Sequence, residues 1–133
     1  MAGGKDNGLR SPLGVARGLG SARAGTGHFL AQRWTAVALV PLTIWFVIGI
    51  IGHLGASYGQ AAAWVGHPFN AVLFILLIVA LFHHAQLGIQ VTIEDYVHTH
   101  AMKVGLIVLV KGAAITFAAL AVFSVLRVSF GDF

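Results

Sequence analysis

Three long apolar runs alternate with shorter polar stretches along the chain, and they set its predicted architecture. The runs cover about residues 34–54, 69–91 and 104–126. At a rise of about 1.5 Å per residue, each run is long enough to cross the ~30 Å hydrocarbon core of a bilayer. The pattern therefore predicts three transmembrane helices.

The polar stretches between the runs are short and differ in character. The first, about residues 56–67, has no Lys or Arg and carries Tyr58 and Trp64, which are typical of the membrane–water interface. The second, about residues 92–103, is rich in ionisable groups. We expect both to be simple connections between helices. Pro41 lies inside the first run and should kink that helix.

The composition agrees with an integral membrane protein. Hydrophobic residues make up 58% of the 133 positions and charged residues only 9%, with a mean hydropathy of +0.88, outside the range of soluble globular proteins. Residues 1–27 are instead rich in Gly, Arg and Ser, so we expect an N-terminal arm preceding a membrane domain at 28–133. The chain has no Cys, so any metal must be held by His or carboxylate.

The basic residues predict an orientation in the membrane. Five of the eight Lys and Arg precede the first run, and Lys103 lies in the second connection, whereas Arg127 stands alone beyond the third run. This asymmetry places the N-terminus and residues 82–100 on the cytoplasmic side. It is a topology signal and does not indicate nucleic-acid binding. We expect the cytoplasmic membrane of a bacterium rather than the mitochondrial inner membrane. Lys111 lies one to two turns inside the third run, where its stem can reach the same surface.

Small residues recur where helices would pack closely in lipid. They are Gly49, Gly52, Gly55, Gly112, Ala114, Ala118 and Ala121. Three helices alone leave polar faces poorly covered. We therefore expect an all-α integral membrane fold in which helices of another subunit complete the bundle.

Residues 82–100 combine four His, two acids and a Tyr at the end of the second run. On an ideal helix, Asp95 lies about 20° around the axis from His84 and about 16 Å along it, so the two share a face. His83 lies about 100° and Tyr96 about 120° from that line. An ionisable residue at membrane depth is a candidate functional site, and His84 is the deeper one on this face.

Two small residues flank His84 one turn away on the same face, Ala80 and Gly88. A flat, bulky group can approach a helix there, and the ring of His84 should lean toward Ala80, into the membrane. The residues alone leave three interpretations of His84 open. It can hydrogen-bond another helix, bind haem or bind a metal ion.

The other histidines suggest less. We interpret His83, His53 and His67 as packing or backbone-bonding residues. His98 and His100 form a His-x-His pair, but two ligands without an obvious third are a weak metal site.

Glu94, Asp95 and Tyr96 close the second helix where water becomes reachable. A carboxylate there can relay protons, and a Tyr hydroxyl can donate a hydrogen bond to a ligand carbonyl while its ring stays in the apolar layer. Arg33, at the mouth of the first run, is a topology anchor whose guanidinium is also suited to bind a carboxylate.

These residues resemble the smaller hydrophobic anchor subunit of succinate:quinone oxidoreductase, respiratory complex II. The resemblance covers about residues 28–127 and three helices in the family's order. Its most specific part is His84 followed, eleven residues on, by Asp95-Tyr96-Val97. A weaker part is Arg33-Trp34-Thr35-Ala36, with His28 and Phe29 just before it. Glu94 stands where the family commonly has Thr.

The resemblance implies roles for individual residues. His84 would be an axial ligand of haem b, and its iron would be the metal that this chain helps to hold. Tyr96 would bind a carbonyl of ubiquinone, Asp95 would tune or protonate that site, and Glu94 and His98 could relay protons.

The resemblance also implies that Arg33 and His28 lie near the haem propionates.

The resemblance further implies three partner subunits. A larger cytochrome b anchor subunit would supply the second axial His, and an iron–sulfur subunit and a flavoprotein subunit would hold the iron–sulfur clusters and FAD. The enzymatic activity would belong to the assembled succinate dehydrogenase, with this chain in contact with membrane lipid.

We keep three alternatives. One is a fumarate reductase anchor that uses menaquinone. Another is a small proton or metal transporter subunit with His84 and Asp95 as a relay. The third is a structural membrane adaptor.

Overall fold

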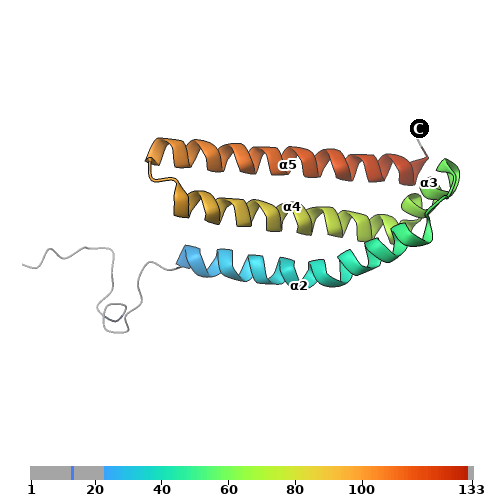
Figure 1. Ribbon diagram of the computed structural model, residues 1–133, viewed down its shortest axis with the longest axis horizontal. Helices are drawn as coiled ribbons and strands as arrows, with labels where there is room; N and C mark the ends of the chain where they lie inside the picture. The colour runs from blue at the N-terminus through green and yellow to red at the C-terminus, as the bar shows by residue number, and fades with distance from the viewer. Residues whose placement is uncertain (1–12, 14–22, 132–133) are drawn as a thin grey trace, which may run out of the picture.

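The computed structural model describes residues 13 and 23–131, and this part of the chain is helical apart from short links. The helices are α2 (Arg23–Gly52), α3 (Tyr58–Gly66), α4 (Pro68–Tyr96) and α5 (His100–Phe130) (Figure 1). Three of them, α2 from Gly25, α4 and α5, are long and apolar enough to cross a membrane. The three predicted spans are therefore confirmed, although each helix extends beyond its apolar run.

The three long helices lie side by side with α4 in the middle (Figure 1). α4 packs against α2 on one side and α5 on the other, while the described parts of α2 and α5 make no close backbone contact. The start of α2 and the link between α4 and α5 lie at one end of the row, which we call the α4–α5 end (Figure 1). α3 lies at the opposite end, the α3 end.

The N-terminal arm predicted at residues 1–27 lies mostly outside the described residues. α2 begins at Arg23, so His28 and Arg33 are both helical residues of α2. Pro41 lies inside this helix, and α2 changes direction part-way along its length (Figure 1). A proline removes one backbone hydrogen bond and clashes with the preceding turn, which explains the bend.

The first connection is not the simple link that we expected, because α3 occupies most of it. Ser57 caps α3. Its side-chain oxygen accepts a hydrogen bond from the backbone N–H of Gln60 at 3.4 Å, and the side-chain oxygen of Gln60 accepts one from the backbone N–H of Ser57 at 2.9 Å. This reciprocal capping box satisfies two amides that would otherwise lack partners. A link of mainly small residues thereby becomes a helix that packs on α4 and α5.

Aromatic rings fasten α3 to the long helices. The centre of the Trp64 ring lies 6.0 Å from the ring centre of Trp45 on α2 and 5.2 Å from that of Phe74 on α4. Gly49 permits this packing, because a Cβ there would overlap the Trp64 indole. Of the predicted close-packing glycines, Gly49 is confirmed, whereas Gly52 and Gly112 face open space within this chain.

α5 begins at His100, so Lys111 lies about three turns into it rather than one or two. Its distance from the start of the apolar run at about residue 104 stays at about two turns.

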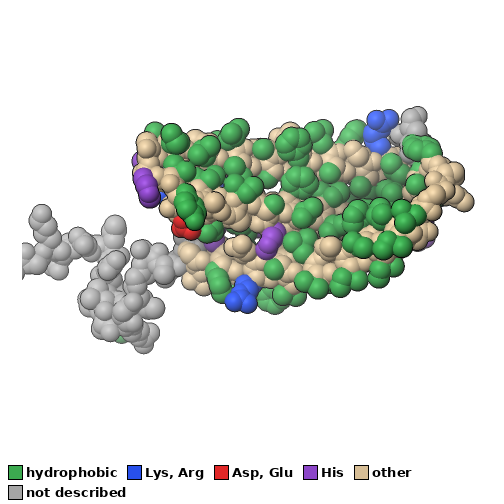
Figure 2. Space-filling model, viewed as in Figure 1, with side chains coloured by type: hydrophobic (Ala, Val, Ile, Leu, Met, Phe, Trp, Pro, Cys, Tyr) green, Lys and Arg blue, Asp and Glu red, His purple; other side chains and the backbone are tan. Residues whose placement is uncertain are grey.

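Little of the apolar surface is buried within the chain. No described side chain is less than 2% exposed, and large apolar residues along all three long helices remain exposed. Figure 2 shows these apolar side chains along the length of the bundle. Acidic side chains are visible on this face only at the α4–α5 end. Such a surface suits lipid and the helices of other subunits.

Candidate functional site

Glu94, Asp95, Tyr96 and His98 lie where α4 ends and α5 begins, whereas His84 lies about 18 Å back along α4. α4 continues through Glu94 and Asp95 and ends at Tyr96, and its cap is the bond from the Val97 amide to the Ile93 carbonyl. α5 starts at His100. The predicted polar link at 92–103 thus shrinks to Val97–Thr99, which holds His98.

His84 contacts α2 through a hydrogen bond. Its Nδ1 lies 3.1 Å from the Thr35 hydroxyl oxygen. That hydroxyl has a single proton, and it already donates to the Ala31 carbonyl at 2.8 Å. The arrangement that satisfies every one of these contacts has the Thr35 oxygen as the acceptor and the proton of a neutral imidazole on Nδ1 of His84.

This arrangement fixes the chemistry of the His84 ring. A neutral imidazole with its proton on Nδ1 has its lone pair on Nε2, and Nε2 makes no hydrogen bond within the described part of the chain. His ligands of metals are commonly held in this way, with the other ring nitrogen donating to a neighbouring group. His84 is half-buried, so it can present Nε2 to a group at the surface of the chain.

The small residues beside His84 differ in what they leave open. Ala80 is one turn before His84, on the same side of α4, and is only 9% exposed. Gly88 faces open space, since nothing lies within 4 Å of the position where its Cβ would be. A bulky group can therefore approach His84 past Gly88, but Ala80 is covered.

The two acids of the site have different surroundings. One carboxylate oxygen of Glu94 accepts a hydrogen bond from the side-chain amide of Gln90 at 2.8 Å. The side-chain oxygen of Gln90 in turn accepts one from the side-chain amide of Gln86 at 2.9 Å. Asp95 makes no hydrogen bond or ion pair within residues 25–131. The structure thus ties Glu94 to its own helix and leaves Asp95 available to other groups.

This glutamine ladder escaped the sequence analysis. Gln86 and Gln90 are the buried polar residues among those described, at 9% and 8% exposure. Their spacing of four residues, continued by Glu94, places the three side chains along one side of a helix. That spacing was the signal that could have revealed the ladder.

Tyr96 is among the most exposed aromatic residues of the chain, at 79%. It is the last residue of α4 and lies about 120° around the axis from His84. Its hydroxyl is therefore presented away from the α2 contact, at the end of the bundle where water is near.

The two residues expected near haem propionates occupy different faces of α2. His28 is seven residues before Thr35, which places it about 20° from the line that faces His84. Arg33 is about 200° from that line, and its guanidinium carbon lies 5.1 Å from the centre of the Phe29 ring. His28 thus shares the α4-facing side, whereas Arg33 lies on the outer side of α2.

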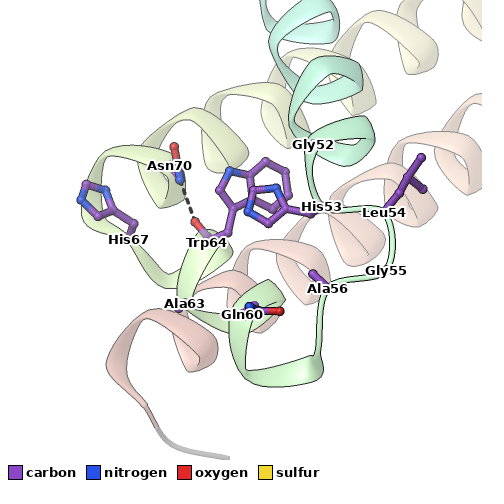
Figure 3. A pocket seen from close by; sticks show the side chains of 10 residues that line it. All are labelled: Gly52, His53, Leu54, Gly55, Ala56, Gln60, Ala63, Trp64, His67 and Asn70. Atoms are coloured by element: carbon purple, nitrogen blue, oxygen red, sulfur yellow. Dashed lines mark hydrogen bonds between the residues drawn. The ribbon is translucent and has the colours of Figure 1, made fainter.

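A second group of polar residues lies at the α3 end. A cavity of about 750 Å³ is lined there by His53, Gln60, Trp64, His67 and Asn70, among others (Figure 3). His53 stacks on Trp64 at 4.5 Å and its Nδ1 lies 2.8 Å from the Gly49 carbonyl.

The Asn70 amide at this end donates to the Trp64 carbonyl at 2.8 Å. The interpretation of His53 as a packing and backbone-bonding residue is confirmed. In the described residues, no three His or acidic side chains come together as a metal site.

Comparison with known proteins agrees with this arrangement. Residues 7–126 match the family described as the succinate dehydrogenase/fumarate reductase transmembrane subunit. The chain belongs to this family.

Individual relatives support the assignment. The chain is 35% identical over 122 residues to a succinate dehydrogenase hydrophobic membrane anchor subunit of Paracoccus denitrificans, covering 91% of this chain and 93% of the relative. It is 32% identical over 104 residues to the subunit of the same name in Rickettsia conorii, covering 77% and 82%. No solved structure matches the chain.

Family membership settles the general role of the chain. It is a multi-pass membrane subunit that anchors a succinate dehydrogenase/fumarate reductase complex, and the complex is an enzyme with further subunits. The predicted resemblance is confirmed at this level.

Removing the Thr35 hydroxyl should weaken any ligand bond made by His84. Thr35→Val keeps the shape of the side chain but leaves Nδ1 of His84 without an acceptor. Loss of such an outer partner commonly lowers metal affinity by about 10–100-fold. For the haem ligation that the resemblance implies, the measurement is haem retention by the purified complex during washing with detergent. Thr35→Ser, which keeps the hydroxyl, is the control. Equal haem retention by the two variants would contradict the assignment of the Thr35 hydroxyl as the partner that supports His84.

Proposed function

We propose that this chain is the membrane anchor of a succinate:ubiquinone oxidoreductase, in which it co-ligates haem b and contributes to the site of quinone reduction. The observation that carries the proposal is the hydrogen bond from Nδ1 of His84 to Thr35. It holds the ring and leaves Nε2 for iron. The haem would supply one-electron redox chemistry, with a potential that depends on its ligands and burial.

The surroundings of His84 fit a shared haem. The open approach past Gly88 admits a flat group, and the exposed apolar surface beside it is available to a second anchor subunit. A larger cytochrome b subunit would supply a second His ligand. His28, on the α4-facing side of α2, would contact one propionate, and Arg33 on the outer side would reach another only around the helix.

Tyr96 and Asp95 would bind and protonate the quinone. Tyr96 would donate a hydrogen bond from its hydroxyl to a quinone carbonyl, whose oxygen gains negative charge as electrons arrive. Asp95 would pass protons from water to that oxygen, because its carboxylate is not held by another group of the described chain. Glu94 is engaged by Gln90, so with His98 it would serve at the outer part of the proton path.

The chemistry that precedes quinone reduction would lie in the partners. A flavoprotein subunit with FAD would oxidise succinate, and an iron–sulfur subunit would carry the electrons to the membrane. The cytoplasmic membrane of a bacterium, with the α4–α5 end on the cytoplasmic side, would place both soluble subunits beside Tyr96. The family description also covers fumarate reductases, so an anchor that serves the reverse reaction with menaquinone is the second candidate.

Purification of the chain with its native partners tests this proposal. In mild detergent, a flavoprotein and an iron–sulfur protein should co-purify, and reduction with succinate should produce the absorption bands of haem b. A complex that contains both soluble proteins but shows no haem bands would leave the anchor role intact and contradict the haem assignment. Isolation of the chain without either protein would contradict the proposed complex.

A further inference from the structure

A cleft between α4 and α5 lies outside the site described above. It has a volume of about 270 Å³, and α4 contributes Val79, Phe82, His83 and Gln86 while α5 contributes Lys111, Ile115 and two alanines. Gln86 lies about 200° around α4 from His84. The cleft is thus on the α5 side of α4, away from the contact between His84 and α2.

Lys111 brings a positive charge to this cleft without an acidic neighbour. It makes no hydrogen bond or ion pair in the part of the chain that the structure describes. The two described acids, Glu94 and Asp95, lie in the last turn of α4. Lys103 is at the same level, and its ammonium donates a hydrogen bond to the backbone carbonyl of Glu94 at 3.0 Å. Lys111 is eight residues further along α5, or about 12 Å deeper. An ammonium in an apolar layer is stabilised by an anion or by reaching the headgroup layer, and no described acid lies beside Lys111.

The lining of the cleft is graded along the membrane normal. Lys111, His83 and Gln86 lie nearer the α4–α5 end. Val79 is about 6 Å deeper than His83 along α4, and Ala118 is about 10 Å deeper than Lys111 along α5. The deeper part is apolar. A molecule that fits this gradient has an anionic head toward the α4–α5 end and an apolar body below it.

The polar end of the cleft can receive an anionic head. The side chain of Lys111 leans toward the start of α5 and can carry its ammonium toward the headgroup layer. One amide proton of Gln86 is used on Gln90, which leaves a second N–H for another acceptor. His83 is exposed beside them.

We propose that this cleft binds an anionic phospholipid from the leaflet at the α4–α5 end. Its phosphodiester pairs with Lys111, and one acyl chain occupies the space between Phe82 and Ile115. Basic pockets between transmembrane helices bind lipid headgroups in this way. A carboxylate on a neighbouring helix would satisfy Lys111 too, but it would not use the apolar depth of the cleft. The proposal does not depend on haem or quinone binding.

Photolabelling of the purified complex tests the proposal. The complex is reconstituted in phosphatidylcholine nanodiscs that contain a trace of phosphatidylglycerol with a photoreactive group in its acyl chain. We expect labelled peptides that contain Phe82 or Ile115, with labelling roughly fivefold or more lower in Lys111→Leu. Lys111→Arg should retain the label. Lys103→Gln, which removes the same charge from the same helix outside the cleft, is the matched control and should retain it too.

Three results would overturn the proposal. The first is equal labelling of these peptides by a photoreactive phosphatidylcholine, which would show that the charge is not recognised. The second is an unchanged level of label in Lys111→Leu or an equal loss in Lys103→Gln. The third is loss of a partner subunit from Lys111→Leu but not from Lys103→Gln, which would assign the anion to a carboxylate of that partner.

Discussion

Replacing His84 with alanine should remove most of the haem b absorbance of the purified complex. Nε2 of His84 is the ring atom that remains available for iron, because Nδ1 is held by Thr35. Alanine offers no replacement ligand, so a haem shared with a partner subunit would lose the ligand that this chain is proposed to supply. The measurement is the absorption spectrum after reduction, normalised to the flavin content of the same preparation.

His83→Ala is the matched control for this experiment. The substitution removes the same imidazole group from the adjacent position, but His83 lines the cleft on the α5 side of α4. That variant should keep most of its haem. An equal loss in the two variants would contradict the assignment of His84 as the ligand and would suggest that the spectrum reports the folding of α4.

Replacing Tyr96 with phenylalanine should impair quinone reduction and spare succinate oxidation. The hydroxyl would donate to an oxygen that becomes negative during the reaction, and a hydrogen bond to a charged group contributes about 1.5–3 kcal/mol. Quinone reduction should therefore fall by roughly 10–100-fold. The ring remains, so packing at the end of α4 is unchanged.

Two assays on one preparation separate the roles of Tyr96. Succinate oxidation with an artificial soluble acceptor measures the partner subunits, and reduction of ubiquinone measures the membrane site. Tyr58→Phe makes the same change at the other exposed tyrosine, at the start of α3, and should affect neither assay. If Tyr96→Phe lowered both activities together, the residue would be structural.

Several features of this chain could be predicted from local properties of the sequence. The three spans follow from the lengths of the apolar runs, and the end of α4 at Tyr96 follows from the change to polar residues there. The common face of His84 and Asp95 follows from helical periodicity. The boundaries of α2 and α5 were less accurate, because polar residues continue both helices beyond their apolar runs. α3 was missed although Ser57 and Gln60 carry the local signal of a capping box. The contact between Trp64 and Gly49, which holds α3 against α2, could not be read from the sequence.

The alignment of His84 and Asp95 on one helix face could be derived from the sequence alone. The structure was needed to compare His84 with His83, and Asp95 with Glu94. Helices that are apolar around their whole circumference carry no signal for which face packs inward. Only the tertiary structure showed that α4 lies between α2 and α5 and that Thr35 orients His84. The bond from Gln90 to Glu94 lies within one helix, and the four-residue spacing could have revealed it. Composition and periodicity determined which residues share a helix face. Contacts between helices distant in sequence decided what each face does.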